Sequence, residues 1–128
     1  MNYIISTKNA PNAIGPYSQA IKVNHFLMIS GQIPIDVRSG EMPKTIEEQT
    51  YLVLKNIKSI IDASELKVKN IIKTTIFSTD LRDFDAINHI YQTFFINNQS
   101  TFPARSFVEV KKLPKNAKIE IEAIAFFK

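Results

Sequence analysis

Residues 101–127, TFPARSFVEVKKLPKNAKIEIEAIAFF, contain two runs in which apolar and polar side chains alternate as they do in β-strands. Arg105 lies in the first run, and Glu120 and Glu122 lie in the second. A guanidinium that stays charged is costly to bury, so Arg105 should have a carboxylate partner in the protein or in a ligand. Because the two strands are close in sequence, we expect them to pair antiparallel and to bring Arg105 near a glutamate.

Two questions about this charged group stay open on physical grounds. The strand register is not fixed by the sequence, so either Glu120 or Glu122 is a possible partner of Arg105. A cross-strand salt bridge at the surface is the commoner arrangement and would contribute little stability. The aromatic and aliphatic neighbours in both runs favour a partly desolvated site instead. There, Arg105 would bind a carboxylate in a bidentate manner, and a glutamate of raised pKa would act as general base or acid.

The first half of the chain predicts strands followed by a helix. Residues 18–23 and 26–33 are β-suited runs separated by Asn24-His25, a two-residue hairpin turn. Thr45 and Glu48 form a capping box, and apolar residues recur at helical spacing behind it, so we expect an amphipathic helix over 45–63.

The second half predicts a strand, a helix and the two C-terminal strands, which gives the order β-β-(β)-α-β-α-β-β. The strand covers residues 70–78, and Asp80 or Asp83 caps the second helix. Its apolar stripe is Phe84, Ile87, Ile90, Tyr91, Phe94 and Phe95. This order indicates an α+β fold with a mixed sheet and both helices on one face. Apolar residues on the other face predict a homo-oligomer that buries it.

The composition describes one ordinary globular domain, residues 1–128, with 45% hydrophobic and 22% charged residues. No apolar stretch is long enough to span a membrane and no signal peptide is evident, so we expect a cytoplasmic protein. The absence of cysteine excludes disulfides and thiol nucleophiles. The net charge of +4 comes from scattered lysines, which gives weak support for nonspecific RNA contact and no support for the reading of a nucleic-acid sequence.

Metal and nucleotide sites are not indicated either. His25 falls in a predicted turn and His89 in a helix, so the two histidines have no ligand or triad spacing. Three glycines in the whole chain leave no phosphate-binding loop. We therefore expect neither a metal nor a nucleotide cofactor.

Two further segments are candidates for a binding site. Tyr17, in Gly-Pro-Tyr-Ser, would project a phenol into a pocket, although a tyrosine after Gly-Pro is more often a loop anchor. Gly31, in Ser-Gly-Gln, lies within a strand pattern and indicates a bulge or a close backbone approach. Its N–H would then be available to an anion, although a glycine needed only for packing is the favoured interpretation when this position is taken alone.

Taken together, these motifs resemble those of the RidA (YjgF) family, the reactive intermediate deaminases. The resemblance runs in order along essentially the whole chain. It rests on residues 13–20 (AIGPYSQA), 30–34 (SGQIP), 73–77 (KTTIF), 80–84 (DLRDF), 102–106 (FPARS), 113–115 (LPK) and 118–125 (KIEIEAIA), together with Asn88, Tyr91, Phe94 and Phe95.

The resemblance implies a chorismate-mutase-like fold assembled as a homotrimer, with active sites in the clefts between subunits. It implies hydrolysis of enamines and imines, such as 2-aminoacrylate and 2-iminobutanoate, to 2-keto acids and ammonia, without metal or cofactor. Arg105 would hold the substrate carboxylate, and Glu120 rather than Glu122 would activate the attacking water. The positions that would line the pocket are Tyr17, Ser30, Gly31 and Asn88.

One position departs from the family pattern. Members with deaminase activity typically have cysteine where this chain has Phe107, two residues after Arg105 and therefore on the same side of the strand. Because imine hydrolysis needs no thiol, we expect activity with an altered preference for substrate size. The alternatives are a non-catalytic, carboxylate-binding or regulatory trimer, and an RNA-cleaving translation inhibitor. The scattered basic residues and the lack of a histidine pair argue against RNA cleavage.

Overall fold

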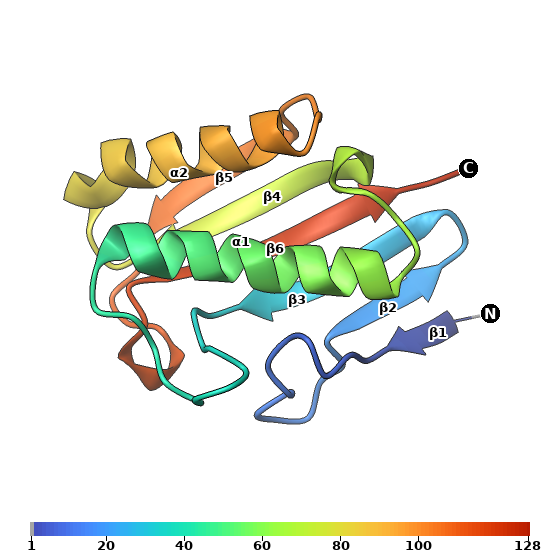
Figure 1. The fold of residues 1–128 in the computed structure, drawn as a ribbon, viewed down its shortest axis with the longest axis horizontal. Helices are drawn as coiled ribbons and strands as arrows, with labels where there is room; N and C mark the ends of the chain where they lie inside the picture. Colours follow the sequence, from blue (N-terminus) through green and yellow to red (C-terminus); the bar gives the residue numbers. More distant parts are fainter. Residues whose placement is uncertain (1) are drawn as a thin grey trace.

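The computed structural model describes residues 2–128 as one six-stranded sheet with two α-helices (Figure 1). Three short 3₁₀ turns cover Val68–Asn70, Leu81–Asp83 and Pro114–Asn116. The elements are, in chain order, β1 (Asn2–Ile5), β2 (Ala20–Val23), β3 (Phe26–Gln32), α1 (Ile46–Ala63), β4 (Ile71–Ser78), α2 (Phe84–Asn97), β5 (Ala104–Glu109) and β6 (Ile119–Phe126).

The strand order in the sheet is β1-β2-β3-β6-β4-β5, and every neighbouring pair is antiparallel except β4 and β5. The prediction that the two C-terminal strands pair with each other is therefore wrong, because β4 lies between them. The reason is the helix α2. A strand, a crossover helix and a second strand bring the chain back parallel, so β5 takes one edge of β4. The other edge of β4 is left for β6.

Local sequence signals account for the first helix and the first hairpin. Thr45 is the N-cap of α1, and its hydroxyl accepts a hydrogen bond from the Glu48 amide at 3.1 Å, which confirms the predicted helix start. Asn24 adopts a left-handed conformation (φ 52°) in the two-residue turn between β2 and β3. The optional third strand that the predicted order places directly before the helix is wrong, because no strand lies between β3 and α1, where the structure describes every residue. The additional strand is β1 at the N-terminal end, which forms one edge of the sheet and was not predicted.

Both helices pack on one face of the sheet, as predicted, and the core lies between the two layers (Figure 1). Alternate residues of β6 are fully covered there, among them Ile119 and Ile121. The other face has no helix over it within residues 2–128. It exposes Phe26, Met28 and Phe126, which have more than a third of their surface in solvent. This apolar face is the one that the sequence assigns to an oligomer contact, and the assembly itself stays a prediction.

No α-helix among residues 2–128 has the length and apolar character that crossing a membrane requires.

Candidate functional site

Arg105 lies in β5, half-buried, with its guanidinium directed at helix α2. Nη1 donates a hydrogen bond to Oδ1 of Asn88 at 2.8 Å. Three aromatic rings surround the guanidinium, with centroids 5.0 Å (Tyr91), 5.3 Å (Phe107) and 5.8 Å (Phe84) from Cζ. These distances are within the range of cation–π attraction. We call these five residues the Arg105 cluster.

The two elements present this cluster through their ordinary periodicities. In β5, residues two apart share a face, so Phe107 lies on the same side as Arg105, as the sequence predicts. In α2, Phe84, Asn88 and Tyr91 are four and three residues apart and lie along one helical stripe. The Tyr91 hydroxyl shares a 2.7 Å hydrogen bond with buried Thr74 of β4. That bond fixes the ring on which the guanidinium rests.

A cavity of about 260 Å³ opens in front of Arg105. Its lining consists of Asn88, Tyr91, Gln92, Phe102, Pro103 and Arg105. The ion pairs within residues 2–128 are Lys58 with Asp62 and Arg82 with Asp80, so Arg105 has no acidic partner there. A half-buried, fixed guanidinium facing such a cavity is suited to bind a carboxylate.

Glu120 belongs to a second group of candidate residues, in β3, β6 and the loop before β2. Its carboxylate lies over Gly31, where a Cβ at position 31 would overlap Oε2 and approach Cδ to 2.8 Å. The pairing of β3 with β6 shifts register between Ile29 and Gln32, in line with the bulge predicted at Gly31. The atoms that approach Gly31 closely belong to the side chain of Glu120, not to a backbone. Burial, and after it the neighbouring Glu122 carboxylate, raises the pKa of Glu120 above its ordinary value. A carboxylate of raised pKa is better matched to proton transfer near neutral pH.

Tyr17 and Ser30 flank this second group. The Tyr17 hydroxyl accepts a 3.2 Å hydrogen bond from the Ile14 amide, so the tyrosine ties its own loop and still has 45% of its surface exposed. The Ser30 hydroxyl donates to the Ser18 carbonyl oxygen at 2.6 Å. Both residues line a cavity of about 490 Å³ that also contacts Glu122. We call Tyr17, Ser30, Gly31 and Glu120 the Glu120 cluster.

Within one chain the two clusters are on opposite faces of the sheet. Arg105 lies opposite Thr74 of β4, and Thr74 lies opposite Ala123 of β6. Thr74 and Ala123 are buried beneath the helices, on the side where Arg105 meets α2. Glu120 is three residues from Ala123 along an extended strand, so its side chain leaves the other face. The expectation that Arg105 and a glutamate approach each other across adjacent strands is therefore wrong for a single chain.

Three contributors were not recognised as site residues in the sequence. Phe84 and Tyr91 were assigned to the apolar stripe of α2, although they contact the guanidinium. Their spacing with Asn88 along the helix is the signal that would have grouped them. Gln19 is buried, and its side-chain amide donates to the carbonyl oxygen of Pro11 at 2.8 Å and accepts from the Thr7 amide at 2.7 Å. It thereby fixes the segment that leads to Tyr17.

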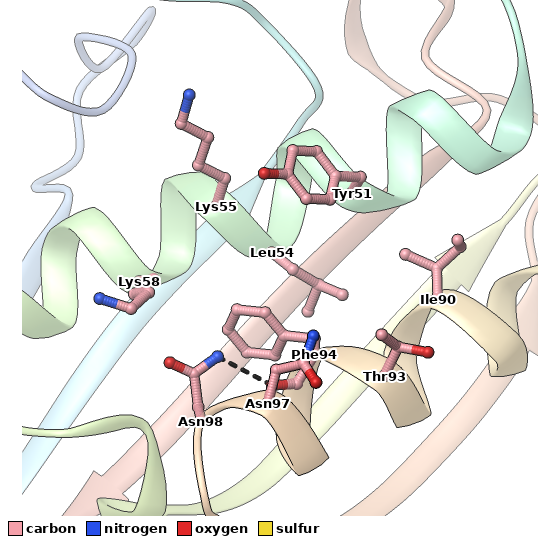
Figure 2. A pocket seen from close by; sticks show the side chains of 9 residues that line it. All are labelled: Tyr51, Leu54, Lys55, Lys58, Ile90, Thr93, Phe94, Asn97 and Asn98. Atoms are coloured by element: carbon pink, nitrogen blue, oxygen red, sulfur yellow. Dashed lines mark hydrogen bonds between the residues drawn. The ribbon is translucent and has the colours of Figure 1, made fainter.

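A separate cavity of about 270 Å³ lies between α1 and α2 (Figure 2). Its floor is apolar, with Leu54 and Phe94 at its centre. In the view of Figure 2, the amines of Lys55 and Lys58 point away from Phe94. The cavity therefore lacks the convergent polar groups that fix a ligand, in contrast to the cavity at Arg105.

Comparison with known proteins places this geometry in a family. The family model described as Endoribonuclease L-PSP matches residues 7–127. A RutC family protein of Buchnera aphidicola subsp. Acyrthosiphon pisum is 64% identical over 128 residues, which cover all of both chains. The 2-iminobutanoate/2-iminopropanoate deaminase of Escherichia coli K12 is 50% identical over 125 residues, which cover 98% of each chain.

Solved structures agree with the sequence comparison. The crystal structure of E. coli TdcF with bound serine superposes with a TM-score of 0.97 at 48% identity, covering 98% of this chain and 99% of TdcF. At that identity and coverage the similarity extends beyond the fold to the sequence along nearly the full length.

Proposed function

The chain belongs to the RidA (YjgF) family, and we propose that it is a 2-iminobutanoate/2-iminopropanoate deaminase. Its identity with named deaminases over nearly the full chain makes it a hydrolase that acts on C–N bonds. The proposed substrates are the small enamines and imines that carry a carboxylate, such as 2-aminoacrylate. The products are the 2-keto acid and ammonia.

The observation that carries this proposal is the state of Arg105. Its guanidinium is half-buried, is held by Asn88 and three rings, and has no acidic partner among residues 2–128. A charge held in this way favours an anionic ligand, and the planar fork matches a carboxylate. Bound serine in the structure of TdcF, a small molecule with a carboxylate, supports a ligand of this class.

Glu120 supplies the second function of the site, the activation of water. A protonated imine carbon is already electrophilic, so the reaction needs a positioned water and a base rather than a strong nucleophile. The water oxygen bonds to the imine carbon while Glu120 takes its proton. Glu120 then returns the proton to the nitrogen, and the C–N bond breaks so that ammonia leaves. As the C=O bond of the keto acid forms, the hydroxyl proton of the intermediate passes to the Glu120 carboxylate. The raised pKa of Glu120 suits these steps.

The proposed catalytic unit combines two chains. Arg105 and Glu120 leave opposite faces of the sheet, so one copy supplies the Arg105 cluster and a neighbouring copy supplies the Glu120 cluster. A homotrimer with sites between subunits meets this requirement, and the exposed apolar face of the sheet is suited to the contact. In this arrangement Tyr17, Ser30 and the Gly31 amide line the cleft with Glu120, and Asn88 and Phe107 line it with Arg105.

The test generates 2-iminobutanoate in place, from threonine and a dehydratase, and follows the competition between semicarbazide trapping and 2-ketobutyrate formation. We expect the wild type to divert the imine to the keto acid, Arg105→Ala to abolish this, and Arg105→Lys to keep little of it because a lysine lacks the bidentate fork. Arg82→Ala is the matched control, since Arg82 is exposed and pairs with Asp80.

A wild-type protein that leaves the trapping rate unchanged would refute the deaminase assignment. If that protein still binds 2-ketobutyrate in an Arg105-dependent manner, the chain is a carboxylate-binding trimer instead.

A further inference from the structure

Phe84 and Phe107 hold their rings edge to face beside the Arg105 guanidinium. Their centroids are 4.9 Å apart at an interplanar angle of 60°, which is a favourable aromatic geometry. Phe107 is half-buried and packs against the core, whereas Phe84 is 40% exposed at the start of α2. The pair therefore links the core to the surface along one side of the guanidinium.

Tyr91 and Asn88 hold the guanidinium independently of that pair. Tyr91 is held by its hydrogen bond to Thr74 and by its ring contact with Phe95 at 4.7 Å. Asn88 accepts one N–H of Arg105. A long side chain with several rotatable bonds is thus confined by three neighbouring rings and by one hydrogen bond.

Aromatic rings confine a guanidinium without consuming its donors. Arginine has five N–H groups, and the bond to Asn88 uses one of them. A glutamate in place of either ring would bind the remaining N–H groups and exclude a ligand. A ring face attracts the positive charge and offers no comparable acceptor in the plane of the guanidinium. The free N–H groups stay available toward the cavity lined by Phe102 and Pro103.

We propose that Phe84 and Phe107 are positioning residues that pre-orient the Arg105 guanidinium for a small carboxylate. This inference rests on the proposed function for the identity of the ligand. The confinement itself exists in the free protein and is measurable without a ligand. Because Arg105 contacts the carboxylate in both the ground state and the transition state, loss of the confinement by Phe84 and Phe107 weakens binding and leaves the chemical step largely intact.

The experiment compares Phe107→Leu, Phe84→Leu and the double variant with the wild type. The first readout is the order of the Arg105 Nε–H group in the free protein by ¹⁵N relaxation, which we expect to be high in the wild type and reduced in each variant. The second is the Kd for 2-ketobutyrate by calorimetry, with the KM for 2-iminobutanoate. We expect both to rise roughly threefold to tenfold in each single variant, with kcat within about twofold.

Two further variants separate positioning from general damage to the fold. Phe107→Tyr keeps the ring and should retain the wild-type Kd. Phe94→Leu removes an aromatic ring from α2, the helix that carries Phe84. Phe94 packs on Phe95, with ring centroids 5.2 Å apart, and is not part of the Arg105 cluster. It should lower Tm and leave the Kd unchanged. Phe84 and Phe107 act as a pair, so the double variant should lose less than the product of the two single effects.

The outcomes distinguish this inference from the proposed function. Two results would overturn the positioning role of Phe84 and Phe107 and leave the deaminase assignment untouched. One is an Arg105 Nε–H group that is as ordered in Phe107→Leu as in the wild type. The other is a rise in Kd for Phe94→Leu equal to that for Phe107→Leu. If the wild type fails the deaminase assay, the proposed function is overturned. If Phe107→Leu nevertheless has lower Nε–H order and lower affinity for 2-ketobutyrate than the wild type, the positioning role is supported.

Discussion

The carboxylate of Glu120 occupies the space over Gly31 that any other residue would need for its side chain. Gly31→Ala should therefore move the carboxylate and leave the backbone in place, because the displaced atoms are the far end of a flexible side chain. We expect kcat to fall roughly 10²-fold, as for a misplaced catalytic group, with little change in Tm. Steady-state kinetics and a thermal melt check this.

Gly15→Ala is the matched control for that substitution. A Cβ at Gly15 would meet the Tyr17 ring at 3.5 Å, an ordinary contact, so activity should be retained. A Gly31→Ala protein with wild-type kcat would show that the position of the Glu120 carboxylate is unimportant for turnover.

Glu122 should set the acidic limit of activity through its effect on Glu120. The negative charge of Glu122 contributes to the raised pKa of Glu120, so Glu122→Gln should lower that pKa. Glu120 must be ionised to act as base, and the acidic limb of the kcat/KM profile should move to lower pH. Glu120→Gln should instead reduce kcat by about 10² to 10⁴ across the profile. A limb that stays in place in Glu122→Gln would argue against Glu120 as the titrating base.

Complementation between two inactive variants should reveal a shared site. Arg105→Ala and Glu120→Gln each remove one half of the catalytic unit. When the two are unfolded together and refolded, a mixed assembly of the proposed kind would contain some sites with an intact Arg105 from one chain and an intact Glu120 from its neighbour. Random mixing should restore about a quarter of the sites. Each variant refolded alone should stay inactive, and a mixture as inactive as its parts would show that Arg105 and Glu120 do not form a shared site between chains.

A carboxylate at position 88 should compete with the substrate carboxylate for the Arg105 guanidinium. Asn88→Asp places a carboxylate 2.8 Å from Nη1 of Arg105, at the position of the present amide oxygen. The new ion pair should compete with the substrate carboxylate and raise KM by roughly tenfold or more, whereas Asn88→Ala should raise it less. Substrate titrations of both variants test the order. A larger effect from alanine would mean that Asn88 contributes by contacting the substrate directly.

The buried pair of Thr74 and Tyr91 should show in stability. Tyr91→Phe leaves the Thr74 hydroxyl without its 2.7 Å partner and should lower the free energy of unfolding by about 1–3 kcal/mol. Adding Thr74→Val removes the unsatisfied group and should recover part of that loss. Urea denaturation at one fixed protein concentration measures both. Equal stability of Tyr91→Phe and the wild type would contradict a structural role for this bond.

Local patterns predicted much of the fold because they are set by neighbours in sequence. The Thr45 cap, the turn at Asn24 and the side shared by Arg105 and Phe107 all follow from short-range geometry. The order of the last strands was not predictable in this way, because inserting β6 beside β4 is a long-range choice. Without that order, the alternation in residues 101–127 leads to the expectation that Arg105 and Glu120 share a face of the sheet, whereas their side chains leave opposite faces.

The contact between aromatic residues of α2 and Arg105 could not be predicted for a different reason. Its aromatic residues all satisfy the requirement for an apolar stripe, and hydrophobic periodicity does not separate those that fill the core from those that surround a charge. Phe95 is fully buried, while Phe84 contacts the Arg105 guanidinium from an exposed position. Only the strand that α2 packs against distinguishes the two.

Because β4 lies between β5 and β6, the proposed site takes Arg105 and Glu120 from two chains, and its activity should depend on protein concentration. If each reaction centre is a contact between neighbouring chains, dilution below the dissociation constant of the assembly removes active sites even while each chain remains folded. Specific activity should then decline on dilution and return when the sample is concentrated again.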